Sequence, residues 1–98
     1  MYKKHILVTG CAGFIGFHIS KHLLKNSKTC IIGIDNINKY YDLNLKKNRL
    51  RELNNYTNFK FFKIDISNIK KLDKIFNQYD FFKVVNLAAQ AGVRYSLN

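Results

Sequence analysis

The stretch VTGCAGFIG, Val8 to Gly16, decides how this sequence is interpreted. It follows a short run of branched apolar residues and leads into a helical pattern, so its three glycines lie where a strand changes into a helix. Glycine accepts backbone conformations that other residues avoid, and the free amide groups at a helix N-terminus attract anions. The stretch therefore predicts a turn that can hold a phosphate group.

Each glycine has its own expected role. Gly10 lets the chain turn off the strand, Gly13 keeps side chains away from a pyrophosphate, and Gly16 lets the helix pack close to the sheet. A glycine-rich turn is a weak signal by itself, because the same pattern serves as a simple tight connection. Its place in the first strand-helix-strand unit strengthens the dinucleotide interpretation.

An acidic residue at the end of the second predicted strand supports the same interpretation. Asp35 lies 19 residues after Gly16, close to the spacing of about 20 at which a carboxylate accepts both hydrogen bonds of an adenosine ribose. A carboxylate would repel a 2′-phosphate, and the next residue is Asn36 rather than an arginine. NAD is therefore favoured over NADP, with Lys39 close enough to weaken that preference.

Hydrophobic periodicity predicts alternating strands and helices along the whole chain. The first helix is expected to turn Ile15, Ile19 and Leu23 toward the core, and Lys60 and Lys63 suggest that the third strand lies at a sheet edge. The expected fold is α/β, the incomplete first half of a Rossmann-type doubly wound parallel sheet with strand order 3-2-1-4. Strands are expected at residues 5–9, 29–35, 59–65 and 82–88, and helices at 14–25, 43–53 and 69–79.

Composition limits the remaining possibilities. The 98 residues suffice for one small domain, and 47% hydrophobic content without proline is typical of a globular chain. The net charge of +11 raises the possibility of a nucleic-acid partner, but the lysines are spread along the chain instead of clustered, so we expect neither a nucleic-acid nor a membrane partner. Cys11 and Cys30 fit buried, reduced thiols in a cytoplasmic protein, and the sequence indicates no metal site.

The chain resembles the extended short-chain dehydrogenase/reductase family, the NAD-dependent epimerases and dehydratases. Within it, the chain is most similar to nucleotide-sugar epimerases of the UDP-glucuronate 4-epimerase type found in capsule polysaccharide biosynthesis. Asn86 departs from the histidine common in the family and is expected to face the core. The resemblance is carried by Thr9-Gly10 and the glycine loop, Asp35-Asn36, Asp65-Ile66, Leu87-Ala88-Ala89, and the stretches DNINKYYDLNLKKNRL (35–50) and NLAAQAGVRYS (86–96).

The resemblance implies a set of cofactor contacts. Arg94 is expected to contact the anionic sugar nucleotide or to be a structural residue at a helix start. The implied contacts are Gly10, Gly13, Phe14, Ile15 and Gly16 to the pyrophosphate, Asp35, Asn36 and Asn38 to the adenosine ribose, Asp65 and Ile66 to the adenine, and Leu87, Ala88, Ala89 and Gln90 to the nicotinamide side.

The implied chemistry is oxidation and reduction at sugar C4 through a 4-keto sugar, with NAD carrying the hydride. The family's base is a Tyr-x-x-x-Lys pair, and we expect it to lie beyond residue 98. Two matches to that spacing, Tyr56 with Lys60 and Tyr79 with Lys83, lead directly into predicted strands and are interpreted as coincidences. We therefore expect residues 1–98 to be the N-terminal part of an NAD-binding domain, without catalytic residues or sugar site and inactive alone.

Two alternatives stay open at this point. The chain could be a dinucleotide-binding module without catalysis, or the N-terminal part of a nucleotide-sugar 4,6-dehydratase. A complete protein of the epimerase type would bind a UDP-sugar and form a homodimer. The fourth strand, internal in a complete sheet, would be an apolar edge here, so we expect the isolated chain to aggregate.

Overall fold

The computed structural model describes residues 4–37 and 43–88. Strands and helices alternate along the described chain. They are β1 (Lys4–Thr9), α1 (Phe14–Leu24), β2 (Thr29–Asp35), α2 (Leu43–Leu53), β3 (Phe59–Lys63), α3 (Ile69–Gln78) and β4 (Phe81–Asn86).

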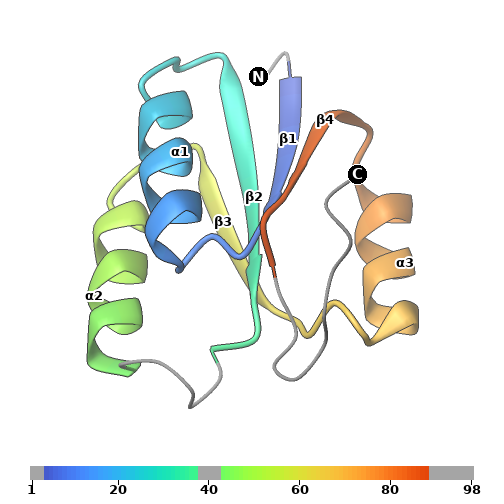
Figure 1. Cartoon of the computed structure of the whole chain (residues 1–98). Coiled ribbons are helices and arrows are strands. Elements are labelled where there is room, and N and C mark those ends of the chain that lie inside the picture. The colour runs from blue at the N-terminus through green and yellow to red at the C-terminus, as the bar shows by residue number, and fades with distance from the viewer. Residues whose placement is uncertain (1–3, 38–42, 89–98) are drawn as a thin grey trace.

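The strands form one four-stranded parallel sheet in the order β3-β2-β1-β4. Helices α1 and α2 lie on one face of the sheet and α3 lies on the other (Figure 1). This is the Rossmann-type half-sheet that the sequence predicts, with β3 at an edge, and both expectations are confirmed. Because all strands run the same way, the glycine loop after β1, Asp35 after β2 and Leu87 after β4 share the carboxyl edge of the sheet.

The core consists of two apolar layers, one on each face of the sheet. On the α1 and α2 side, Ile6 and Val8 of β1 pack with Phe17 and Leu53. On the α3 side, Leu7 and Ile75 belong to the second cluster. The two central strands are thus apolar on both faces, which explains why they appear in the sequence as continuous hydrophobic runs.

Two elements, 29–35 and 43–53, have the predicted boundaries, and the others differ from the prediction by one or two residues at one or both ends. The third strand ends at Lys63 instead of residue 65, because the Asp65 side chain accepts hydrogen bonds from the amide and the hydroxyl of Ser67 and turns the chain toward α3. The fourth strand covers Phe81–Asn86 instead of 82–88. No helix among the described residues is long and apolar enough to cross a membrane.

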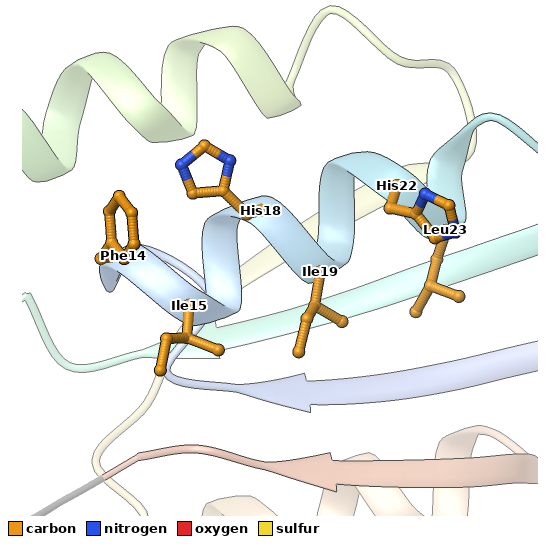
Figure 2. Close-up of a pocket in the computed structure, with 6 residues that line it drawn as sticks. All are labelled: Phe14, Ile15, His18, Ile19, His22 and Leu23. Atoms are coloured by element: carbon orange, nitrogen blue, oxygen red, sulfur yellow. The ribbon is translucent and has the colours of Figure 1, made fainter.

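The predicted core face of α1 is correct for Leu23, which packs against the core, and wrong for Ile15. The buried residues of this helix are Gly16, Phe17, Ser20 and Leu24, whereas Ile15 is 59% exposed. The small residues Gly16 and Ser20 let the helix backbone approach the sheet and the glycine loop, and in this orientation Phe14 and Ile15 are exposed. They line a surface hollow of about 450 Å³, composed of Phe14, Ile15, His18, Ile19, His22 and Leu23 (Figure 2).

The contact beneath Gly16 generates a prediction about stability. A Cβ atom at Gly16 would lie 2.1 Å from the carbonyl oxygen of Gly10, so the helix would have to shift. A Cβ at Gly13 would lie 3.3 Å from the same oxygen, which requires a much smaller adjustment. We expect Gly16→Ala to lower the free energy of unfolding by about 3 kcal/mol, and Gly13→Ala by less than about 1 kcal/mol. Chemical denaturation followed by circular dichroism measures both, and equal losses would contradict this packing.

The exposed β4 edge generates a second prediction. Strand β4 ends the sheet, and its Val84 is 46% exposed. Unpaired apolar edges recruit other chains, so we expect the native chain to self-associate and Val84→Lys to reduce that association. Asn77→Lys on α3 adds the same charge away from the edge and is the control. Light scattering coupled to gel filtration reports the mass, and a monodisperse native species of 11.5 kDa would contradict the prediction.

Candidate functional site

The glycine loop is fixed by backbone hydrogen bonds to β2 and within itself. The amides of Gly10 and Cys11 donate to the Ile34 carbonyl at 2.7 and 3.2 Å, and the Gly13 amide donates to the Gly10 carbonyl at 3.0 Å. Gly10 has φ of +73°, and a Cβ there would lie 2.9 Å from the backbone nitrogen of Ala88. This position therefore requires glycine for both its conformation and the closeness of the chain after β4.

The loop delivers the N-terminus of α1 to the carboxyl edge of the sheet without a side-chain cap. Gly13 is the N-cap residue and makes no side-chain hydrogen bond, and the first turn contains no acidic residue. The amides at such a terminus, together with the helix dipole, favour an anion. Little of the protein lies near the position of a Gly13 Cβ apart from the Gly10 carbonyl, so a phosphate group fits in front of this turn.

Asp35 is buried and already receives three hydrogen bonds. Its Oδ2 accepts from the Ala12 amide at 3.1 Å, and its Oδ1 accepts from the Ile37 amide at 2.8 Å and from Lys46 Nζ at 3.3 Å. A carboxylate offers about four acceptor positions, so at least three are occupied. The structure thus leaves Asp35 about one acceptor position beyond these three contacts.

Two cations of α2 belong to this region, and the sequence analysis did not identify either of them. Lys46 is 8% exposed and forms a buried ion pair with Asp35. Arg49, one turn later, donates from Nη1 to the Ala12 carbonyl at 3.0 Å. The available signal was the place of Lys46 among apolar residues of the helical pattern, which indicates a buried lysine and hence a buried acidic partner.

Thr9 fastens the end of β4 to the loop. Its hydroxyl donates to Asn86 Oδ1 at 2.5 Å, and its Oγ1 accepts from the amides of Leu87 at 3.0 Å and Ala88 at 3.2 Å. Asn86 is exposed at this edge, so the expectation that it faces the core is wrong. The polar contact to Thr9 holds the Asn86 side chain at the end of β4, outside the apolar layers.

The other predicted site residues divide into three groups. Asn36 and Ile66 are half-buried and Asp65 is exposed at the same carboxyl edge, following β2 and β3. The carboxylate of Asp65 is engaged by Ser67. Phe14, Ile15 and Gly16 form the first turn of α1. Asn38, Ala89, Gln90 and Arg94, together with Lys39, lie outside the described residues.

The described tyrosines do not lie at this edge, and the thiol of Cys11 in the glycine loop is not reactive. Tyr56 and Tyr79 precede β3 and β4 and so lie at the amino edge of the sheet, opposite the glycine loop. Burial, and next the charge of Asp35, raise the pKa of the Cys11 thiol, so that it stays protonated. Both cysteines are free and buried, as expected, and residues 4–37 and 43–88 contain no group of three or more potential metal ligands.

The fold and this edge together define a Rossmann-type α/β protein whose glycine loop leads into an uncapped helix N-terminus. A family model described as GDP-mannose 4,6 dehydratase matches residues 7–98, and the chain belongs to this family. The family includes the epimerase and dehydratase relatives that the sequence motifs suggested, so the resemblance is confirmed.

Known proteins give closer comparisons. UDP-glucuronate 4-epimerase of Thermodesulfobacterium geofontis is 50% identical over 93 residues, which is 95% of this chain and 28% of the relative. Protein CapI of Staphylococcus aureus is 49% identical over 94% of this chain and 27% of its own length. The crystal structure of UDP-glucuronic acid 4-epimerase from Bacillus cereus in complex with UDP-glucuronic acid and NAD matches with a TM-score of 0.79 and 41% identity, over 92% of this chain and 28% of that one. The chain therefore spans under a third of the length of these relatives.

The buried pair of Asp35 and Lys46 generates a third prediction. Lys46→Met removes the ammonium but leaves the buried carboxylate, which costs about 3 kcal/mol of unfolding free energy. Lys47→Met is the matched control, because the neighbouring Lys47 is exposed, and its effect should stay within about 0.5 kcal/mol. Urea denaturation of both variants checks this, and a Lys46→Met variant as stable as the control would contradict a buried pair.

Proposed function

We propose that this chain is the NAD-binding, N-terminal part of a nucleotide-sugar 4-epimerase of the UDP-glucuronate type. The observation that carries the proposal is the uncapped N-terminus of α1 beside the buried Asp35, at the edge where the strands end. It is supported by the likeness to the Bacillus cereus epimerase, whose structure contains NAD and UDP-glucuronic acid.

The pyrophosphate of NAD would lie against the first turn of α1. The backbone amides of that turn would donate to its oxygens, and Gly13 would leave room for them. Adenine would lie toward Asp65 and Ile66, and the nicotinamide toward Leu87 and Ala88, which the Thr9 hydroxyl holds in place. Ala89 and Gln90 would extend the nicotinamide side, and Arg94 would contact the sugar nucleotide.

The adenosine ribose would be bound by an acidic and a basic residue together. Asp35 would accept a hydrogen bond from one ribose hydroxyl at its remaining acceptor position. Lys46, whose Nζ lies 3.3 Å from Asp35 Oδ1, would donate to the other hydroxyl. Asn36 and Asn38 would complete this side of the site. The division follows from the number of donors that Asp35 already accepts.

When bound, NAD supplies the hydride acceptor and donor for the reaction at sugar C4. The residues of this chain contribute binding and orientation of the cofactor. The proton transfers belong to residues outside the described part, because the described tyrosines lie at the opposite edge of the sheet. The UDP-sugar, the catalytic base and a homodimer would then belong to a protein of the length of the relatives.

Calorimetric titration with NAD tests the proposal. Gly13 has φ of −73° and ψ of 170°, which valine adopts readily. Gly13→Val should therefore preserve the fold while placing a branched side chain where the pyrophosphate lies, and we expect affinity for NAD to fall at least about tenfold. Lys47→Met is the control and should leave affinity unchanged. Equal affinity of Gly13→Val and the native chain would contradict the phosphate site.

A further inference from the structure

The surroundings of Asp35 contain more positive than negative charge. Lys46 Nζ lies 3.3 Å from Asp35 Oδ1. Arg49 Nη1 lies 3.0 Å from the carbonyl oxygen of Ala12, and the amide of the same Ala12 donates to Asp35 Oδ2 at 3.1 Å. One loop residue thus joins the carboxylate to the guanidinium. Within the described ranges 4–37 and 43–88, two cations and one anion meet at this place.

The helix α2 holds both cations toward the glycine loop. Lys46 and Arg49 are three residues apart and therefore lie on the same side of the helix. Lys46 is buried and Arg49 is half-buried, so water screens their charges less than it screens the charges of exposed lysines. Arg49 also lies near the Phe14 ring, with its guanidinium carbon 5.9 Å from the centroid. Both side chains are thus held in place by contacts to the loop or to Asp35.

Two fixed cations beside the ribose position are the donor set that a phosphate prefers. A guanidinium and an ammonium form short, charge-assisted hydrogen bonds to phosphate oxygens. In dinucleotide-binding sheets, an acidic residue at the end of the second strand hydrogen-bonds to the 2′-hydroxyl of NAD, whereas a nearby arginine accommodates the 2′-phosphate of NADP. This chain has both kinds of residue at the same place.

We propose that Lys46 and Arg49 form a latent site for a 2′-phosphate, and that the carboxylate of Asp35 suppresses it. Selectivity for NAD over NADP then depends on one charge, not on the shape of the loop. The inference rests on the proposed function, because it takes the adenosine ribose to lie beside Asp35. Removing the carboxylate charge converts the site from a ribose-diol site into a 2′-phosphate site.

Adenosine half-ligands isolate this part of the cofactor. ADP and 2′-phospho-ADP share the adenosine 5′-diphosphate and differ only at the 2′ position, so the ratio of their dissociation constants reports the 2′ site without the nicotinamide or the sugar. The native chain should bind ADP more tightly. Asp35→Asn keeps the side-chain shape and an acceptor oxygen, and we expect it to shift the ratio toward 2′-phospho-ADP by at least about tenfold.

Second substitutions test whether the two cations cause the gain in relative affinity for the 2′-phosphorylated ligand that is expected for Asp35→Asn. Adding Arg49→Gln or Lys46→Gln to Asp35→Asn should remove most of it, whereas adding Lys47→Gln, on an exposed lysine of the same helix, should leave it. A gain that survives both Arg49→Gln and Lys46→Gln would overturn the proposal, as would an unchanged ratio in a folded Asp35→Asn variant. Circular dichroism checks the fold of each variant.

One further variant tests Arg49 while Asp35 is kept. Arg49→Gln in the otherwise native chain should shift the ratio further toward ADP by about threefold, because one of the two attracting charges is lost. An unchanged ratio there would count against the proposal even if Asp35→Asn did not fold. If the native chain bound neither ADP nor NAD, the proposed function would fail together with this inference, whereas binding of ADP without the shift would overturn the inference alone.

Discussion

The approach of Gly16 to the carbonyl of Gly10 is the constraint on which the rest of this structure depends. A Cβ at Gly16 would lie 2.1 Å from that oxygen, so the contact exists only between backbones. It fixes the rotation of α1, turns Gly16, Phe17, Ser20 and Leu24 inward, and leaves Phe14 and Ile15 exposed beside the surface hollow (Figure 2). It also presents the uncapped start of α1 at the edge where Asp35 and the end of β4 meet.

The second organising element is the carboxylate of Asp35, which is a structural group before it is a ligand-binding one. Its hydrogen bonds connect the glycine loop through Ala12, the end of β2 through Ile37, and α2 through Lys46. A buried carboxylate is tolerated only with such partners, because desolvation otherwise disfavours its charge. The same contacts restrict its orientation, so a ribose would meet a group that is already positioned. Preorganisation of this kind lowers the entropic cost of binding.

Sequence patterns predicted the sheet better than they predicted the site. Strand order and the crossing helices followed from apolar runs such as that of β2, which is buried along its whole length, and from the handedness of parallel crossovers. The face of α1 could not be predicted from periodicity, because hydrophobic residues repeat on two sides of this helix and the decisive residue, Gly16, has no side chain. Lys46 and Arg49 were missed because their partners, Asp35 and Ala12, are 11 and 37 residues away in sequence. Asn86 was misplaced because only its long-range contact to Thr9 shows that it lies outside the core.

That contact of Thr9 also bears on the order of folding. The hydroxyl of Thr9 reaches the amide of Ala88 across a sequence separation of 79 residues, and β1 pairs with β4 along its length. Closing so long a loop is entropically unfavourable, and non-local parallel pairing is slow. Strand β1, the first of these four strands to be synthesised, is therefore the last to have both of its neighbouring strands in place. Until β4 is available, one side of a fully apolar central strand lacks its partner, so a nascent chain remains aggregation-prone until nearly all of these residues have been made.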